Sequence, residues 1–124
     1  MADCVFCTLG EDRVFLENEL ACCLWDAFPV TPMHSLIVPR RHLPDFFSLT
    51  QAEVLACDAL LRGARDLIRA EDPSVEGFNI GVNVGEVAGQ TIFHCHLHLI
   101  PRRKGDSENP RGGVRHILPG MGDY

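Results

Sequence analysis

Short apolar runs alternate with polar or glycine- and proline-bearing turns along most of this chain, a pattern that predicts β-strands. The first two runs are joined by the polar turn Glu17-Asn18-Glu19, and Pro39 ends the third after a proline-containing loop at residues 26–32. The last two runs flank a turn at residues 85–89 that begins and ends with glycine. The predicted strands are residues 14–16, 20–25, 35–38, 78–84 and 93–100.

Helical spacing replaces this pattern between the third and fourth runs. Thr50-Gln51-Ala52-Glu53 is a capping box, in which the Thr and Glu side chains satisfy free backbone amides at a helix start. Asp72-Pro73 ends the periodic segment, so we expect one main helix of about 20 residues, with a shorter helical turn at residues 44–47. The apolar positions at helical spacing are Val54, Cys57, Leu61, Ala64 and Ile68.

These elements predict an α+β fold whose strands, joined by short turns, form an antiparallel sheet. The 124 residues are enough for a single domain with its own core, which we place at about residues 4–102. Glycines and prolines interrupt any periodicity from Asn109 to Tyr124. We expect residues 103–124 to form an extended tail that has little structure of its own from Asn109 onward and packs across a partner subunit.

Composition and charge narrow the class of protein. The net charge of −6 argues against a nucleic-acid-binding surface, no apolar stretch reaches the length of a membrane span, and the first four residues do not resemble a signal peptide. Six cysteines could form a disulfide framework, but Cys22 and Cys23 are adjacent, Cys57 falls in the helix and Cys95 in a strand. We therefore expect reduced thiols in a cytoplasmic protein, with Cys22, Cys23 and Cys57 as small buried apolar residues.

Basic residues gather near the C-terminus although the chain as a whole is acidic. They would form either a mobile basic arm that meets substrate phosphates or a solvated tail that docks on acidic surface, and the sequence leaves both open. The residues are Arg102, Arg103, Lys104, Arg111 and Arg115.

The last predicted strand contains three of the six histidines, His94, His96 and His98. At about 3.3 Å of rise per residue their rings would lie on one face of the strand, about 6.5 Å apart. Imidazoles are poor core residues because both ring nitrogens need hydrogen-bond partners. We therefore expect this face to be catalytic or metal-binding.

His96, flanked on both sides, is best placed to act as a nucleophile. If a backbone carbonyl held its Nδ1–H, its Nε2 would present a free lone pair. Phosphorus is the natural target, since neighbouring imidazoles and backbone amides can hold phosphate oxygens. The preceding run from Asn83 to Thr91, with Gln90, offers polar side chains and glycines that admit a ligand, although such a turn is also typical of a hairpin.

Cys4-Val5-Phe6-Cys7 offers half of a tetrahedral zinc site, which two histidines could complete. Ordinary buried thiols and a redox pair are the alternatives, although a redox role would need a helix N-terminus after a strand. The histidine strand could itself be a His-x-His ligand set, but it lacks an evident third ligand and carboxylate. His34 and His42 are further candidate ligands, and His116 has no assigned role.

These residues resemble the signature of the histidine-triad (HIT) superfamily of nucleotide hydrolases and transferases, His-φ-His-φ-His-φ-φ, where φ is apolar. Residues 94–100 match it at every position, and residues 32–39, 89–93 and 101–102 are also similar to the family. With its Cys-x2-Cys start, the chain resembles the bacterial-type members that bind zinc at the N-terminus, and the likeness spans about residues 4–102.

The resemblance implies a five-stranded antiparallel sheet with one long and one short helix, and a homodimer with a continuous ten-stranded sheet. It implies that His96 attacks the α-phosphate of a purine nucleotide conjugate and that water then hydrolyses the nucleotidyl-histidine. His98 would hold phosphate and assist the leaving group, and His34 would orient the nucleophile. The residues expected to contact phosphate or leaving group are Asn83, Gln90 and Thr91.

A nucleoside site and a structural zinc are implied as well. Asp26 would bind ribose, while Val5, Phe6 and Leu24 would wall the base. From the residues alone, Asp26 could instead open the turn before Pro29, and the three apolar residues could simply be core. Zinc would leave no open position for chemistry, and the chemical step would need no cofactor. The implied zinc ligands are Cys4, Cys7, His42 and His94.

We therefore expect a nucleotide hydrolase acting on phosphoramidates or dinucleoside polyphosphates. Thr91 stands where the phosphoramidase branch usually has serine, and residues 102–124 also differ from that branch. Two other functions stay open: a nucleotidyltransferase or phosphorylase of dinucleoside polyphosphates, and a nucleotide-binding regulatory dimer whose catalysis is incidental.

Overall fold

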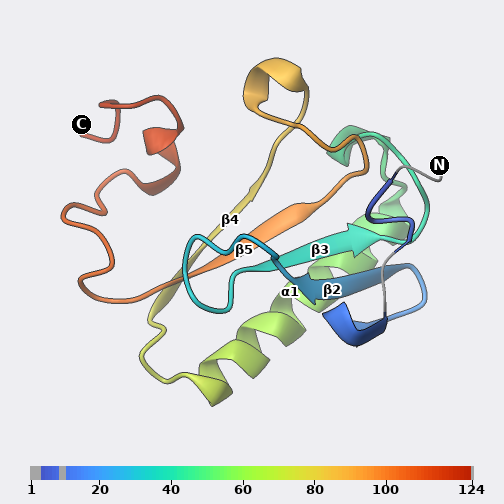
Figure 1. Ribbon diagram of the computed structural model, residues 1–124, viewed down its shortest axis with the longest axis horizontal. Helices are drawn as coiled ribbons and strands as arrows, with labels where there is room; N and C mark the ends of the chain where they lie inside the picture. The colour runs from blue at the N-terminus through green and yellow to red at the C-terminus, as the bar shows by residue number, and fades with distance from the viewer. Residues whose placement is uncertain (1–3, 9–10, 124) are drawn as a thin grey trace.

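Five strands form one antiparallel sheet in the order β1-β2-β3-β5-β4 in the computed structural model (Figure 1). The structure describes residues 4–8 and 11–123. Most of the first four residues, on which the expectation about a signal peptide rests, and the last residue of the predicted tail lie outside the described residues. The predicted α+β class and the antiparallel sheet are confirmed. The strands are β1 (Val14–Glu17), β2 (Ala21–Trp25), β3 (Ser35–Pro39), β4 (Gly77–Val82) and β5 (Leu97–Arg102).

The main helix α1 (Gln51–Glu71) begins with the predicted capping box. The Thr50 hydroxyl accepts from the Glu53 amide at 3.1 Å, and the Glu53 carboxylate accepts from the Thr50 amide at 2.9 Å. The Arg41 guanidinium donates to the same carboxylate at 2.8 and 3.1 Å, and this contact is the main reason that the pKa of Glu53 falls to about 2. The helix start is thereby tied to the chain that follows β3.

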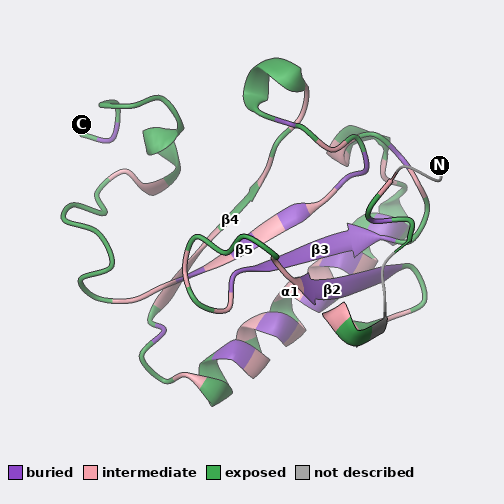
Figure 2. Cartoon of the chain, viewed as in Figure 1, coloured by how far each residue is buried: buried purple, intermediate pink, exposed green. Residues whose placement is uncertain are grey.

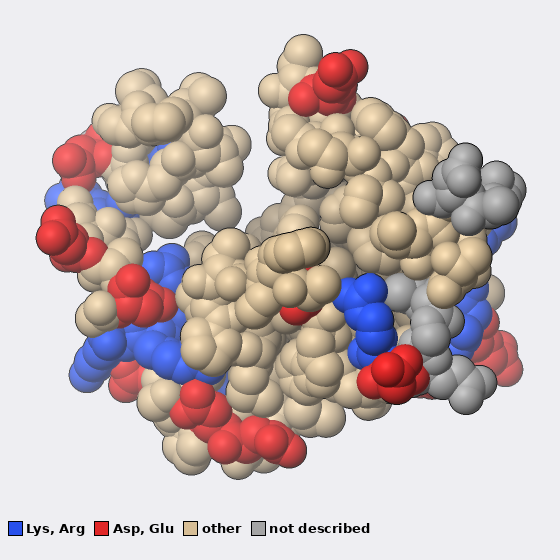
Figure 3. All heavy atoms as spheres, viewed as in Figure 1, with Lys and Arg blue, Asp and Glu red and all other residues tan. Residues whose placement is uncertain are grey.

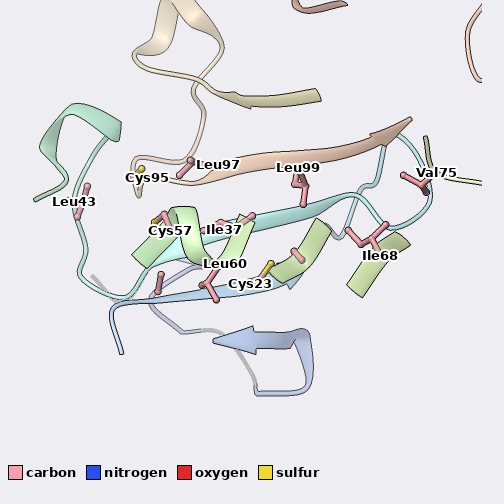
Figure 4. Close-up of a cluster of buried hydrophobic side chains, with 12 residues drawn as sticks. Cys23, Ile37, Leu43, Cys57, Leu60, Ile68, Val75, Cys95, Leu97 and Leu99 are labelled. Carbon is pink, nitrogen blue, oxygen red and sulfur yellow. The ribbon is translucent and has the colours of Figure 1, made fainter. Parts of the chain in front are cut away.

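The core lies between α1 and one face of the sheet, as the buried stripes of both show (Figure 2). Gly63 brings the helix close to β1, because a Cβ atom there would lie 2.9 Å from Leu16 Cδ2. Cys22, Cys23 and Cys57 are buried as predicted, and all six cysteines are free. Core side chains labelled in Figure 4 are Cys23, Ile37, Leu43, Cys57, Leu60, Ile68, Val75, Cys95, Leu97 and Leu99.

The opposite face of the sheet carries a smaller apolar cluster and the histidines. Leu36 of β3 pairs with His98 of β5, and cross-strand partners share a face, so His98 lies beside this cluster and away from α1. Ile37 pairs with Leu97 and faces the helix. The cluster consists of Phe6, Cys22, Leu24, Leu36 and Val38.

The predicted histidine strand at residues 93–100 is wrong at its start, because β5 begins only at Leu97. The Cys95 amide donates to the carbonyl of Leu43, at 2.9 Å, rather than to a neighbouring strand. His94 and His96 therefore lie in irregular chain, and only His98 lies in the sheet. The predicted fourth strand is also shifted, since β4 covers Gly77–Val82 instead of residues 78–84.

Short 3-10 segments lie near the expected helical turn and inside the C-terminal segment. One covers Phe46–Ser48, close to the predicted residues 44–47. Another covers Gly113–Ile117, where the sequence predicts an extended tail with little structure, and it contacts β4 of its own chain. No helix in the described part of the chain is long and apolar enough to cross a membrane.

Candidate functional site

His96 has the hydrogen bond that a nucleophilic imidazole needs. Its Nδ1 lies 2.9 Å from the carbonyl oxygen of His94, and because a carbonyl can only accept, Nδ1 carries the proton. The Nε2 lone pair is then free. The ring is half-buried, 5.0 Å from the ring of Phe6 and 5.3 Å from that of His98, measured between centroids.

His98, His34 and Asp26 form a second polar group near His96. The backbone amide of Val30 donates to His34 Nδ1 at 3.1 Å, so a neutral His34 carries its proton on Nε2. That nitrogen lies 2.9 Å from His98 Nδ1 and 3.4 Å from Asp26 Oδ2. His98 Nδ1 is therefore an acceptor, and a neutral His98 carries its proton on Nε2.

Burial keeps both of these histidines neutral near pH 7. Desolvation is the main cause that lowers the pKa of His98 to about 4, with further lowering by His96 and His34. Desolvation also lowers the pKa of His34, against the opposing effect of the Asp26 carboxylate. His98 is consequently a hydrogen-bond donor at Nε2 and not a strong acid at neutral pH.

Asp26, His34 and His98 also have possible ligand atoms within 4.8 Å of one another. The 2.9 Å contact between His34 Nε2 and His98 Nδ1 requires a proton between the two nitrogens, so these two histidines are hydrogen-bonded to each other and neither of these nitrogens is free to bind a metal. Asp26 Oδ1 accepts from the Phe28 amide at 2.8 Å, which is the turn-opening contact that the sequence left as an alternative.

The N-terminal cysteines and two histidines converge on one point at the other end of the site. His94 Nδ1 lies 3.4 Å from Cys4 Sγ and 3.5 Å from Cys7 Sγ, and Cys7 Sγ lies 3.2 Å from His42 Nδ1. Zn–S bonds of about 2.3 Å and Zn–N bonds of about 2.0 Å at the tetrahedral angle put ligand atoms about 3.5 Å apart. The four residues thus have the spacing of a tetrahedral zinc site.

His94 is oriented for this ligation by the end of β3. Its Nε2 donates to the carbonyl of Pro39 at 2.8 Å, which leaves Nδ1 as the lone pair that faces the cysteines. The ring is fully buried, and desolvation lowers its pKa, as a neutral metal ligand requires.

The expected base-walling residues differ in how far they reach the surface. Val5 is half exposed, Phe6 is buried with its ring against His94 and His96, and Leu24 is completely buried beneath them.

Of the three loop residues expected to contact phosphate or leaving group, one has an engaged side chain and two are exposed. Gln90 is buried: its Oε1 accepts from the Gly85 amide, and its Nε2 donates to the carbonyls of Pro44 and Ile92. Its amide therefore holds the loop in shape. Asn83 and Thr91, by contrast, are exposed.

The two arginines at the end of β5 dock on acidic partners. Arg102 forms a two-pronged ion pair with Asp106, and Arg103 contacts Asp72 at 2.9 Å. Figure 3 shows blue and red side chains interleaved in this region. For these two arginines the structure favours the docked segment over the mobile basic arm.

Sequence reasoning did not identify which backbone groups set the proton positions, namely the carbonyls of Pro39 and His94 and the amide of Val30. Main-chain groups occur at every residue, so no sequence signal marks these three. It also missed the cavity of about 610 Å³ that opens beside His34 and His98 and is lined in part by the C-terminal segment.

Known proteins that this chain is similar to include a zinc-bound histidine triad family protein from Mycobacterium smegmatis. Its structure matches with a TM-score of 0.76 and 32% identity over 87% of this chain and 81% of that one. An adenylylsulfatase of Arabidopsis thaliana is 36% identical over 84% of this chain, and an asymmetrical bis(5′-nucleosyl)-tetraphosphatase of Schizosaccharomyces pombe is 36% identical over 78%. The chain spans about half the length of these two enzymes, 54% and 53%.

A family model described as the HIT domain matches residues 10–105, which include the triad, His34, His42 and all five strands. The likeness in sequence thus covers the same part of the chain as the sheet and most of the site. On this evidence the chain belongs to the HIT domain family.

Proposed function

We propose that this chain is a nucleotide hydrolase that cleaves at the α-phosphate of purine nucleotide conjugates through a nucleotidyl-histidine on His96. The observation that carries the proposal is the 2.9 Å contact between His96 Nδ1 and the His94 carbonyl, which frees Nε2 for attack. The relatives named as an adenylylsulfatase and a tetraphosphatase support nucleotide hydrolysis in general.

In the first step the Nε2 lone pair of His96 forms a bond to phosphorus while the bond to the leaving group breaks. The imidazole becomes cationic, and the His94 carbonyl that accepts from Nδ1–H stabilises that charge. In the second step water attacks phosphorus and loses a proton to solvent, the P–N bond breaks, and His96 returns to its neutral form with its Nδ1 proton.

His98 donates a hydrogen bond from Nε2–H to a phosphate oxygen, and His34 fixes that tautomer from behind. Since a neutral imidazole is a very weak acid, we assign His98 charge stabilisation, with the leaving group protonated by solvent. Asn83 and Thr91 are exposed on the loop before the triad and would contact phosphate or leaving group directly. Gln90 would act by holding that loop in shape.

Asp26 has one carboxylate oxygen bonded to the Phe28 amide and the other facing His34. In the proposal this second oxygen also accepts from a ribose hydroxyl. Val5 and Phe6 would contact the base, and Leu24 would support the Phe6 ring from beneath.

Zinc bound by Cys4, Cys7, His42 and His94 would have a structural role. All four positions would be protein ligands, so the metal would supply no open site and would only fix the N-terminal segment against the triad. Free thiols throughout the chain fit a reducing compartment, and a cytoplasmic location is therefore part of the proposal.

A homodimer formed through β4 is also part of the proposal. β4 is the sheet edge next to β5, and Ile80 on it is 54% exposed beside a groove. The groove is lined by the apolar residues Leu61, Phe78 and Leu99 and by the charged residues Asp58, Arg62 and Arg65. A second copy that paired with this edge would satisfy its free backbone groups and continue the sheet to ten strands.

Replacing the nucleophile tests the mechanism. We expect His96→Ala to lower kcat/KM for adenosine 5′-phosphoramidate and for diadenosine tetraphosphate by more than about 10³-fold, because no group replaces Nε2. Calorimetric AMP binding should persist, which controls for misfolding. Near-normal turnover by the variant would refute the mechanism. Nucleoside diphosphate release in phosphate buffer would indicate a phosphorylase, and AMP binding without turnover by the wild type a regulatory dimer.

The proton positions can be read by NMR of the zinc-loaded protein. Imidazole nitrogen shifts should show Nδ1–H on His96 and Nε2–H on His98, and His34→Ala should leave His98 as a mixture of tautomers. Because the folded pKa of His98 is about 4 against 6.5 in the unfolded chain, its contribution to the free energy of unfolding is lost as the pH falls from 6.5 toward 4. An imidazolium signal from His98 at about pH 6 would contradict this assignment.

Metal analysis tests the zinc site. We expect one zinc per chain by elemental analysis, and its loss in Cys4→Ser and Cys7→Ser, with Tm lower by about 10 °C because binding stabilises only the folded state. Cys22→Ser removes a buried thiol outside the cluster and should retain the metal. Equal zinc content in all three variants would rule the site out.

Light scattering during size exclusion tests the dimer. Ile80→Lys should weaken association at least about tenfold, because it replaces an exposed apolar side chain on the pairing edge by a charge that the dimer would bury. Leu20→Lys, at the turn next to the opposite edge of the sheet, is the matched control and should leave the mass unchanged. A monomeric wild type would disprove the dimer.

A further inference from the structure

The loop that joins β2 to β3, cyan in Figure 1, places two polar groups against His34. The Val30 amide donates to His34 Nδ1 at 3.1 Å, and the Asp26 carboxylate lies 3.4 Å from His34 Nε2. Residues 26–34, all of which the structure describes, contain no helix or strand, and the Val30 side chain is 68% exposed. The position of the Val30 amide thus depends on the contacts that the rest of the loop makes.

Hydrogen bonds within the loop give it a closed shape. The Asp26 amide donates to the His34 carbonyl at 2.9 Å, and the His34 amide donates to the Thr31 carbonyl at 3.1 Å. Between Thr31 and His34, Met33 has a φ of 70°, in the left-handed region that residues other than glycine rarely adopt. Because such a conformation persists only where surrounding contacts enforce it, this turn depends on partners elsewhere in the chain.

Two side-chain hydrogen bonds attach the loop to the end of β5. The Thr31 hydroxyl donates to the carbonyl of Pro101 at 2.8 Å, and Pro101 is buried within β5. The Arg103 guanidinium, one residue beyond β5, donates to the carbonyl of Pro32 at 3.1 Å. Thr31 and Pro32 directly follow Val30, so both contacts act within two residues of its amide.

Arg103 is itself oriented by the end of α1. Its Nε and Nη2 donate to Asp72 Oδ2 at 3.0 and 2.9 Å, and Asp72 is the C-cap residue of α1. Nη2 thus reaches Asp72 and the Pro32 carbonyl at once, and the planar guanidinium joins the helix end to the loop. The Arg103 side chain is only 15% exposed, so solvent and salt screen this ion pair less than a surface pair.

The strand that anchors the loop also carries His98, three residues before Pro101. The Val30 amide keeps the proton of neutral His34 on Nε2, and this proton is donated to His98 Nδ1 at 2.9 Å. Hydrogen bonds are lost beyond a donor–acceptor distance of about 3.5 Å. A loop displaced by about 1 Å would therefore lose the Val30–His34 bond, and with it the reason for a single tautomer of His98.

We propose that Thr31 and Arg103 are positioning residues of this site, which fix residues 26–34 on β5 so that the Val30 amide keeps the proton of His98 on Nε2. Their effect on turnover rests on the proposed function, in which His98 Nε2–H donates to a phosphate oxygen, whereas their effect on the tautomer does not. A merely structural role would lower the stability of the fold and leave the proton of His98 where it is.

Imidazole nitrogen NMR of the zinc-loaded protein tests this inference with Thr31→Val and Arg103→Gln, singly and together. We expect the double variant to show His98 as a mixture of tautomers, and each single variant to change in the same direction by less. We expect kcat/KM of the double variant for adenosine 5′-phosphoramidate to fall about tenfold, because the groups at the site lose their alignment. Thr31→Ser keeps the hydroxyl donor and should retain the wild-type spectrum.

Arg102→Gln is the matched control, because Arg102 is the neighbouring arginine and is likewise paired with a carboxylate. It should leave the His98 proton on Nε2. Among the described residues, the Arg102 side chain donates to three that lie outside the loop, Asn79, Asp106 and Ser107.

His98 with its proton on Nε2 alone in the folded double variant would overturn the inference, even if Tm or turnover fell. A wild type in which His98 is already a mixture of tautomers would overturn it as well. If the double variant does not fold, Thr31→Val gives the same answer, because it replaces only a hydroxyl by a methyl group. Failure of the wild type to cleave any substrate would instead overturn the proposed function, and the spectra would still decide the inference.

Discussion

The buried imidazole of His94 and its backbone hold the N-terminal segment, the end of β3 and His96 in fixed positions relative to one another. Its Nε2 is held by the carbonyl of Pro39 at the end of β3, and its Nδ1 faces the thiols of Cys4 and Cys7. Its own carbonyl holds Nδ1 of His96. One side chain with its backbone therefore ties the N-terminal segment, the sheet and the nucleophile together. Because that ring is fully buried, each nitrogen must be satisfied, and this leaves it a single orientation.

A sheet with two different faces makes this arrangement possible. One face is covered by α1 and buries the larger apolar cluster, which supplies most of the hydrophobic stabilisation. The other face has only a small cluster around Phe6 and Leu36, and next to it the chain can present polar imidazoles to a cavity. His98 thus lies on a strand whose position is set by packing against α1 on the opposite face of the sheet.

Proton positions at the site are determined by main-chain atoms more than by side chains. The Val30 amide fixes the tautomer of His34, which fixes that of His98, and the His94 carbonyl fixes that of His96. The two imidazoles nearest the cavity thereby differ in role although their residue type is the same: His96 presents a lone pair at Nε2 and His98 presents a proton there.

Particular residues show which features of the structure could be predicted from the sequence and which could not. The capping box at Thr50 and Glu53 was predictable, since both partners lie within one turn of a helix. The start of β5 was not, because the Cys95 amide pairs with Leu43, 52 positions earlier in the numbering, and alternation alone cannot show that. Gln90 was expected near phosphate, yet its amide is engaged with loop carbonyls. The sequence left Arg103 open between substrate phosphate and acidic surface, and only the structure shows that it pairs with Asp72.

The sequence by itself determined the α+β class, the helix with its cap, and the residue types of the triad and the Cys-x2-Cys segment, because these depend on local spacing and on side-chain chemistry. The family resemblance implied that Cys4, Cys7, His42 and His94 share a metal site, but only the tertiary structure showed that they converge. It also decided which nitrogen of each histidine is free, and that part of the C-terminal segment borders the cavity beside His98, through Gly113, Val114, His116 and Ile117. Those features rest on contacts between segments far apart in the chain, and such contacts leave no periodic trace in the sequence.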